Sequence, residues 1–280
     1  MKTVRNFLNM KQQNEKIVMM TAYDFPTAQY AEKAGVDVIL VGDSLGMVVL
    51  GYDSTIRVTI DDMVHHTKAV RNGAQDTFIV TDLPFMSYHC SMEETMKSVR
   101  KIMQEGRANA VKLEGGSDDV LTLVDKLSHA GVPVVGHLGL TPQSVEVFGG
   151  YFVQAKEIES AKKLIKQAKQ LEQNGAVMIV LECVPHQVTA IVQKECKIPI
   201  IGIGAGASCD GQVLVFHDIV QFGSHKLPKF VKSYADLGVE VEQAISHYVE
   251  EVKEQSFPQE KHHFSLKEEF VEGLYGGEKK

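Results

Sequence analysis

The amino-acid sequence predicts an α/β protein folded as a (β/α)8 TIM barrel, and three observations support that prediction. Eight short apolar runs recur along the 280 residues, and segments of helical periodicity separate them. The runs are apolar without strict alternation, as parallel strands are when helices cover both faces of the sheet. Eight equivalent units suit a closed barrel better than a doubly wound sheet, whose dinucleotide fingerprint requires a glycine spacing that residues 202–206, GIGAG, do not match.

The expected strands each end near polar residues or glycines. In chain order they span residues 17–24, 36–43, 77–84, 108–115, 132–139, 176–182, 198–206 and 212–218. A capping-box pattern that starts at Ser91 predicts a helix whose apolar stripe includes Met92, and we expect the methionines of this stripe in the core. Another helix is expected from Ile158 onward, and Gly175 stands where a glycine commonly ends a helix.

The remaining segments are assigned to the ends and connections of one domain. Residues 4–13, VRNFLNMKQQ, predict a short N-terminal helix that closes the bottom of the barrel. We expect residues 1–280 to form a single barrel domain, in which about 255–280 are a peripheral, charged C-terminal extension. The longest connection, residues 140–154, is either a lid over a substrate or an ordinary surface loop.

Composition argues against several classes of function. The net charge of -7 and a pI near 5.9 leave no basic stripe, so we expect no nucleic-acid partner. Apolar runs are too short to span a bilayer and the N-terminus does not resemble a signal peptide, which predicts a cytoplasmic protein without a membrane partner. The four cysteines form no CxxC pair and are expected to be reduced, buried and structural, with a thiolate metal cluster or a catalytic cysteine as the alternatives.

Three carboxylates, Asp43, Asp82 and Glu114, stand near the carboxyl ends of the second, third and fourth expected strands. Strand ends converge on the active-site face of a barrel, so these side chains should meet. Clustered carboxylates resist ionisation unless a cation neutralises them, and oxygen ligands favour magnesium or manganese over zinc. The alternative for each acid is to cap the helix that follows its strand.

Other polar side chains should face the same region. Lys112 is two residues from Glu114 on one strand, so both should point inward, and the lysine would bind an anionic substrate group. A Schiff base at Lys112 or a simple ion pair with Glu114 stays open. Glu182 ends a strongly apolar strand, where desolvation would raise its pKa and suit it to act as general base. His137 is expected either to donate to the substrate or to be satisfied by its neighbours.

Sequence motifs covering nearly the whole chain resemble those of the 3-methyl-2-oxobutanoate (ketopantoate) hydroxymethyltransferase family. The most specific are GDSLGMV and GHLGLTPQ, and others are TAYD, VTIDDMVHHTKAV, DLPFMSY, AVKLEGG, LECVP, IGIGAG and DGQVLV. One departure lies after the eighth strand, where the family usually has a Leu-Gly pair and this chain has Gln221 in place of the glycine. The role of that loop is therefore left open.

The resemblance implies a reaction and a set of site residues. It implies transfer of a hydroxymethyl group from the co-substrate 5,10-methylenetetrahydrofolate to 3-methyl-2-oxobutanoate, giving 2-dehydropantoate in pantothenate biosynthesis. Mg2+ would be bound by Asp43, Asp82 and Glu114, and Glu182 would accept the proton. The 2-oxo acid would be held by Asp43, Ser44, Asp82 and Lys112. Family members form large rings, so the resemblance also implies a homodecamer.

Two other interpretations compete with this one. A magnesium-dependent relative of isocitrate or 2-methylisocitrate lyase would use the same barrel, but it would place a catalytic cysteine in a loop, and no equivalent cysteine is apparent. A structural, ring-forming barrel that has lost its chemistry is the other alternative. The intact set of carboxylates argues against it.

Overall fold

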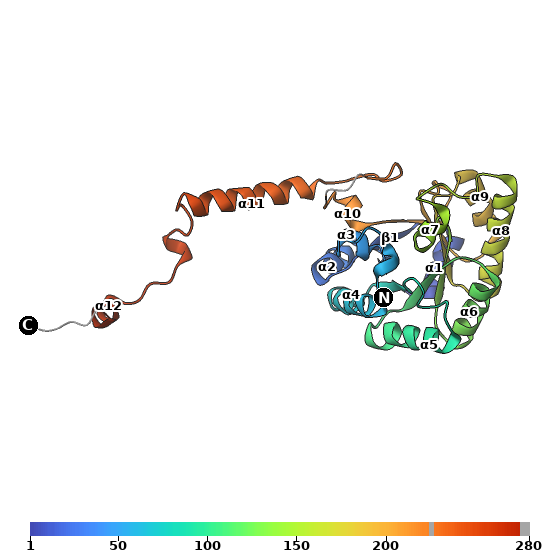
Figure 1. The fold of residues 1–280 in the computed structure, drawn as a ribbon, viewed down its shortest axis with the longest axis horizontal. Coiled ribbons are helices and arrows are strands. Elements are labelled where there is room, and N and C mark those ends of the chain that lie inside the picture. The colour runs from blue at the N-terminus through green and yellow to red at the C-terminus, as the bar shows by residue number, and fades with distance from the viewer. Residues whose placement is uncertain (224–226, 275–280) are drawn as a thin grey trace, which may run out of the picture. The chain divides into compact units, whose positions relative to one another are not determined.

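The eight predicted strands form a closed parallel barrel. The computed structural model describes residues 1–223 and 227–274 (Figure 1). The strands pair in chain order and β8 closes on β1, which confirms the predicted TIM barrel. They are β1 (Ile17–Thr21), β2 (Val38–Val41), β3 (Phe78–Asp82), β4 (Ala110–Glu114), β5 (Val134–Gly139), β6 (Met178–Glu182), β7 (Ile200–Ile203) and β8 (Gly211–Leu214).

Helices alternate with these strands. The longer ones are α2 (Phe25–Ala34), α4 (Ile60–Gly73), α5 (Met92–Arg100), α6 (Asp118–His129), α8 (Ile158–Gln173) and α9 (His186–Glu195). Helix α1 (Val4–Gln12) precedes β1, and the short helices are α3 (Leu45–Val48), α7 (Val145–Phe148) and α10 (Phe216–Ile219). A π-helical segment, η2 (Lys101–Glu105), extends α5, and the 3-10 turns are η1 (Thr55–Arg57), η3 (Pro142–Ser144) and η4 (Glu260–His262).

Apolar side chains separate into an inner cluster and outer layers. The inner cluster fills the barrel with alternate residues of the strands, because successive side chains of a strand point to opposite faces. Its strand members are Ile17, Met19, Val38, Leu40, Phe78, Val80, Ala110, Val135, Met178, Val180, Ile201, Ile203 and Val213. The outer clusters pack the other faces of the strands against the helices.

Helix α1 closes the amino-terminal end of the barrel, as predicted. Phe7 and Met10 belong to the inner cluster, and the rings of Phe7 and Phe78 meet edge to face at 5.2 Å between centroids. Lys11, on the same helix, donates to Oδ2 of Asp210 at 2.7 Å. That oxygen also accepts from the backbone N–H of Ile200 at 2.9 Å, so Asp210 links α1 to the first residue of β7.

The observed strands are shorter than the expected runs, by three residues or more at the carboxyl ends of β1, β7 and β8. The first strand ends at Thr21, and Asp24 instead caps α2 by accepting from the backbone N–H of Thr27. The eighth ends at Leu214, and residues 216–218 of the expected run lie in the short helix α10. The hydroxyl of Thr21 accepts a hydrogen bond from the backbone N–H of Phe216, so this N–H is paired with a side chain and not with the backbone of a neighbouring strand.

The predicted core positions of two helices hold only in part. On α5, Val99 is buried but Met92 is 38% exposed, so the expectation of a wholly buried methionine stripe is wrong. Met92 is the first residue of this helix, and periodicity alone does not show where packing stops. Helix α8 buries Leu164, Ala168 and Leu171, and the positive φ of Gly175 confirms its predicted position after the helix.

The cysteines are free, but they do not share one environment. Cys196 and Cys209 are buried, as expected, whereas Cys183 is half-buried and Cys90 is exposed. The expectation that all four are buried is therefore wrong. Cys90 lies in the connection between β3 and α5, outside the regular packing of helices on strands that buries side chains elsewhere.

Gln221 has a left-handed backbone conformation, with φ of +51°. This conformation costs roughly 1–2 kcal/mol for a residue with a Cβ atom, whereas glycine adopts it freely. The position therefore retains the backbone geometry that favours the glycine of the family pattern. The Gln221 side chain accepts from the hydroxyl of Ser233 at 3.2 Å, an interaction that glycine cannot make.

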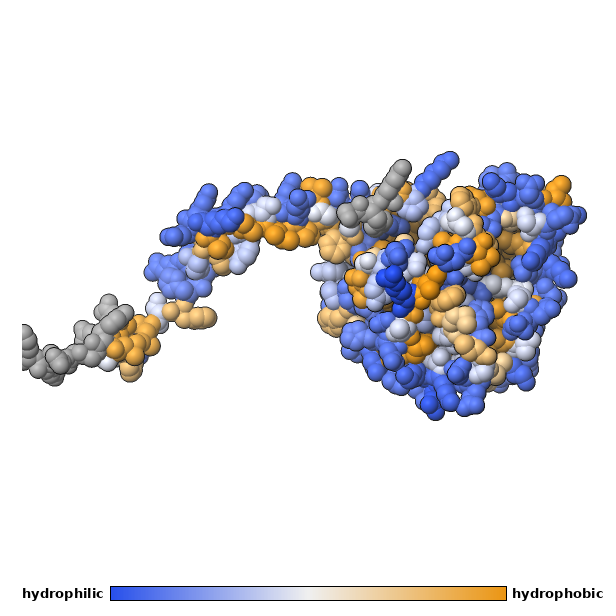
Figure 2. Space-filling model, in the orientation of Figure 1, coloured by the Kyte–Doolittle hydropathy of each residue, from blue (hydrophilic) through white to orange (hydrophobic). Residues whose placement is uncertain are grey.

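The chain divides into two compact units, and the boundary between them falls between residues 234 and 235. The second unit contains α11 (Leu237–Lys253) and α12 (Glu268–Leu274). An apolar stripe along α11, seen as orange atoms in Figure 2, is exposed and includes Val241, Ile245 and Val252. The single-domain interpretation of 1–280, with a peripheral segment from about 255, stays a prediction. No helix in the described ranges is both long and apolar enough to cross a membrane.

Replacing Asp210 by alanine should destabilise the barrel, because the change leaves the ammonium group of Lys11 and the Ile200 N–H without their common partner. We expect a loss of about 3 kcal/mol in the free energy of unfolding, measured by urea denaturation. Asp61→Ala is the matched control, since Asp61 binds Lys101 on the exposed surface, and it should leave stability nearly unchanged. Equal effects of the two substitutions would contradict the proposed link.

Candidate active site

The inward-facing side chains change from apolar to ionisable at the carboxyl ends of the strands. On β4, Lys112 and Glu114 continue the inward series that begins with Ala110, as predicted from their spacing. Strand register places Asp82 opposite Lys112 and His137 opposite Glu114. The sequence-predicted residues of three neighbouring strands are therefore brought together.

Asp43, Asp82 and Lys112 form one side of the buried cluster. Oδ1 of Asp82 lies 3.1 Å from Nζ of Lys112. Its Oδ2 accepts from the backbone N–H of Asp43 at 3.1 Å. This backbone contact places Asp43, which follows β2, beside the end of β3. All three side chains are almost completely buried.

His137 joins this cluster to the predicted general base. Its Nδ1 lies 3.2 Å from Nζ of Lys112 and 3.3 Å from Oε1 of Glu114. On the other side of the ring, Nε2 lies 3.3 Å from Oε2 of Glu182. The Glu182 side chain is 17% exposed, so it is the most open of the four acids. Gly139 pairs with Glu182, and a Cβ atom at position 139 would lie only 2.2 Å from the Glu182 carbonyl oxygen, so the two backbones can approach because this residue is glycine.

Burial and mutual repulsion set the protonation of the cluster. Burial, followed by the charges of Asp82 and Glu114, holds the pKa of Asp43 well above its usual range. Burial also raises the pKa of Asp82, although Lys112 opposes this shift. Burial and Lys112 act to lower the pKa of His137, but its contacts with Glu114 and Glu182 outweigh them and raise it to about 9. Asp43 and Asp82 therefore resist ionisation unless further positive charge is bound beside them.

Ser44 lies beside Asp43 at the start of α3, but its hydroxyl faces a residue that the sequence reasoning did not single out. Oγ of Ser44 is 2.7 Å from the phenol oxygen of Tyr23, in the connection after β1. Burial raises the pKa of the Tyr23 phenol, so this group stays protonated and can donate. Tyr23 stands within the TAYD motif, which was the available signal.

Tyr88 and Gln143 are two further site residues that sequence reasoning missed. Nε2 of Gln143 donates to Oδ2 of Asp43 at 2.7 Å, and its backbone N–H donates to Oε2 of Glu114 at 3.1 Å. The Tyr88 hydroxyl donates to Oε1 of Gln143 at 2.9 Å. Both residues are buried and lie in loops, within the motifs DLPFMSY and GHLGLTPQS. Membership of these motifs was the only sequence signal for them.

The acids offer oxygen atoms to a cation. Oδ1 of Asp82 and Oε1 of Glu114 are buried and accept no well-formed hydrogen bond, although each lies near a cationic side chain. Hard oxygen ligands of this kind fit Mg2+ or Mn2+. Across the described ranges, however, no three His, Cys, Asp or Glu side chains are already gathered as ligands of one ion. The ammonium group of Lys112 neutralises part of the negative charge of these acids.

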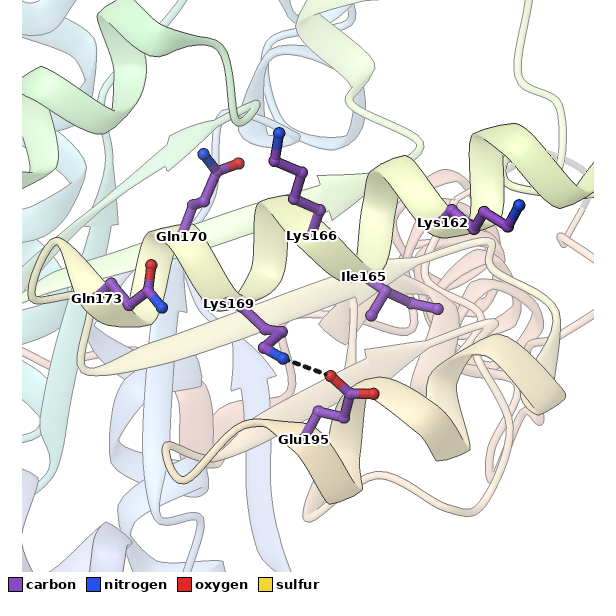
Figure 3. Close-up of a pocket in the computed structure, with 7 residues that line it drawn as sticks. All are labelled: Lys162, Ile165, Lys166, Lys169, Gln170, Gln173 and Glu195. Atoms are coloured by element: carbon purple, nitrogen blue, oxygen red, sulfur yellow. Dashed lines mark hydrogen bonds and ion pairs between the residues drawn. The ribbon is translucent and has the colours of Figure 1, made fainter.

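A separate surface hollow of about 450 Å³ lies on the outer side of the barrel, between α8 and α9 (Figure 3). Its lining is mostly lysine and glutamine side chains of α8, and Lys169 binds Glu195 at 2.8 Å. None of the sequence-predicted site residues lines it. The hollow is therefore separate from the ionisable cluster at the strand ends.

A closed parallel barrel with ionisable side chains at its carboxyl ends defines a TIM-barrel enzyme. A crystal structure of phosphonopyruvate hydrolase with oxalate and Mg2+ has the same fold, with a TM-score of 0.60 and 11% identity over 99% of this chain and 95% of that chain. A 2,3-dimethylmalate lyase of the PEP mutase/isocitrate lyase superfamily gives 0.58 and 13%, over 99% and 92% of the two chains.

The family model of ketopantoate hydroxymethyltransferase matches residues 1–260. The 3-methyl-2-oxobutanoate hydroxymethyltransferase of Bacillus pumilus is 61% identical over 280 residues, covering all of both chains. This chain belongs to the ketopantoate hydroxymethyltransferase family, which confirms the resemblance predicted from its motifs. It is a hydroxymethyltransferase that acts on small molecules.

Replacing Lys112 by methionine should destabilise the metal-free protein, because Asp82 would lose its buried cationic partner. We expect a loss of about 3 kcal/mol in the free energy of unfolding, measured with urea in the presence of EDTA. Lys169→Met removes the exposed partner of Glu195 and serves as the control, with stability nearly unchanged. If Lys112→Met is as stable as the unaltered protein, the lysine does not balance the acids.

Proposed function

We propose that this enzyme transfers a hydroxymethyl group from 5,10-methylenetetrahydrofolate to 3-methyl-2-oxobutanoate, giving 2-dehydropantoate for pantothenate biosynthesis. The names of the similar proteins support the acceptor substrate. The observation that carries the proposal is the arrangement around the His137 imidazole. Lys112, which can bind an anion, and Glu114 lie beside its Nδ1, and the base Glu182 lies beside its Nε2.

The proposed metal is Mg2+, held by Asp43, Asp82 and Glu114. Support comes from the burial of these acids in one network and from the two carboxylate oxygens that lack well-formed hydrogen bonds. Phosphonopyruvate hydrolase, which shares the fold, was crystallised as a complex with oxalate and Mg2+. When bound, Mg2+ would polarise the 2-oxo group and favour loss of the neighbouring proton.

The acceptor is proposed to bind through Asp43, Ser44, Asp82 and Lys112. The ammonium group of Lys112 attracts the substrate carboxylate, and the hydroxyl and backbone N–H of Ser44 supply neutral donors. His137 lies between the metal-site acid Glu114 and the base, so its ring can donate to the substrate as negative charge develops.

Glu182 is the proposed general base, because its carboxylate ends β6 beside His137 and is the most open acid of the cluster. It removes the proton from C3 of the 2-oxo acid, and the electron pair forms the enolate. C3 then bonds to the methylene carbon of the donor. The bonds from that carbon to the two folate nitrogens break, and one water supplies the hydroxyl oxygen. The proton taken by Glu182 and the second proton of the water pass to the two nitrogens, and tetrahydrofolate leaves.

Apolar side chains beside the site support an aromatic co-substrate such as a reduced folate. Met47 follows β2, and Tyr151 and Phe152 belong to the long connection after β5; all three are exposed. The Tyr151 hydroxyl lies 3.7 Å from Sδ of Met47, so the two loops meet. Burial and then the charges of Glu182 and Asp43 raise the pKa of Tyr151, which is consistent with a position near the acids.

The oligomeric state and the cellular location of the protein remain predictions. The homodecamer rests on the family resemblance, and the cytoplasmic location rests on the sequence. Sedimentation velocity of the purified chain would measure the first, and fractionation of cells would measure the second.

Incubation with 3-methyl-2-oxobutanoate and Mg2+ in deuterium oxide should exchange the C3 proton without the folate donor, as measured by NMR. Glu182→Gln should slow this exchange by roughly 10²-fold or more while retaining 2-oxo acid binding measured by calorimetry. Glu195→Gln changes an exposed glutamate of α9 and should exchange normally. Unchanged exchange in Glu182→Gln would remove this residue from the role of base.

Asp82→Asn should raise the Mg2+ concentration that gives half-maximal exchange by about tenfold or more, because an amide is a weaker ligand than a carboxylate. The measurement is a Mg2+ titration of the exchange rate after treatment with EDTA. Asp61→Asn, at an exposed ion pair, should leave the requirement unchanged. The same metal requirement in Asp82→Asn and the unaltered protein would exclude Asp82 as a ligand.

A further inference from the structure

We propose that Gln143, oriented by Tyr88, is a positioning residue that fixes Asp43 and Glu114 for binding of a divalent cation. This inference rests on the proposed metal site and adds two residues that do not bind the metal themselves. Gln143 lies on η3, directly after β5, and only 5% of it is exposed. It can therefore act on the acids without competing for the substrate.

Four groups surround Gln143. Its Nε2 donates to Oδ2 of Asp43 at 2.7 Å and to the carbonyl of Leu83 at 2.9 Å. Its Oε1 accepts from Tyr88, and its backbone N–H donates to Oε2 of Glu114. One residue of the β5 loop thereby connects the acid after β2 with the acid that ends β4.

The orientation of the Gln143 amide is fixed by two independent neighbours. The Leu83 carbonyl can only accept a hydrogen bond, so the amide atom beside it must be the NH2 group. The Tyr88 oxygen already accepts the backbone N–H of Glu114 at 3.3 Å, so its own proton is directed to Gln143. The amide oxygen therefore faces Tyr88, and the second amide hydrogen faces Asp43.

This orientation has a consequence for the acids. Oδ2 of Asp43 and Oε2 of Glu114 are occupied by neutral N–H donors of the same residue. In the described chain, no hydrogen bond reaches Oδ1 of Asp43, and Oε1 of Glu114 accepts none of good geometry. Gln143 thus fixes both carboxylates by one oxygen and leaves the other oxygen of each for a cation.

The test measures binding of Mn2+ to the full-length protein by electron paramagnetic resonance, without substrate. Gln143→Leu removes the contacts to Asp43 and Leu83 but keeps the backbone donor to Glu114. We expect its Kd for Mn2+ to rise at least tenfold. Gln167→Leu is the matched control, because Gln167 donates to the Gly116 carbonyl in a neighbouring loop and contacts none of the acids. Its Kd should be unchanged.

A double-mutant cycle separates positioning from general loss of stability. Tyr88→Phe should raise the Kd about threefold, because the Gln143 amide then loses one of the two neighbours that orient it. Adding Tyr88→Phe to Gln143→Leu should cause less than the loss it causes alone, since Tyr88 acts on Asp43 through Gln143. Circular dichroism and thermal unfolding establish that each variant folds. If Gln143→Leu does not fold, the threefold effect of Tyr88→Phe is the deciding measurement.

Three outcomes would overturn the inference. The first is a Kd for Mn2+ of Gln143→Leu that equals the Kd of the unaltered protein; if that variant does not fold, the same comparison is made with Tyr88→Phe. The second is an equal rise in Kd in Gln167→Leu, and the third is additive losses of Mn2+ affinity in the double variant. Absence of Mn2+ binding by the unaltered protein would instead reject the proposed metal site, and with it this inference. The two failures are therefore distinguishable.

Discussion

Three carboxylates buried around one ammonium group are the constraint on which the site depends. Asp43, Asp82 and Glu114 cannot all remain ionised in a low-dielectric interior unless positive charge and hydrogen-bond donors surround them. Lys112 supplies one charge and contacts Asp82, while His137 lies against Glu114. The neighbouring loops supply the donors. The excess negative charge that remains is what makes the cluster suitable for a dication.

The barrel makes this arrangement possible by separating two kinds of interior. Towards the amino-terminal end, α1 and the inward apolar side chains exclude water, and Phe7 packs directly on Phe78. Towards the carboxyl end, the same alternation continues, but the inward positions become Lys112, Glu114 and His137. Parallel pairing sets His137 level with Glu114, and Asp82 level with Lys112, on adjacent strands. Stability and chemistry thus occupy opposite ends of one inner column.

Much of this could be predicted from sequence because strand alternation is local. The spacing of Lys112 and Glu114 was sufficient to place both inside, and the order of the strands was sufficient to bring Asp82 beside them. Gln143 and Tyr88 could not be found in this way, because their positions depend on the paths of loops that meet only in the folded barrel. The end of β8 was missed for a related reason: a hydrogen bond from Phe216 to β1 ends the run, and no local pattern encodes it.

The hydrogen bonds also suggest why the acids divide into ligands and a base. Asp43, Asp82 and Glu114 each have one oxygen occupied by an amide N–H, which fixes the carboxylate plane. Glu182 has no such anchor in the described chain and meets only the imidazole of His137. A ligand must hold its oxygen still, whereas a base must approach a proton and then move away with it. The anchored acids therefore suit metal binding, and the unanchored one, which is also the most exposed, suits proton transfer.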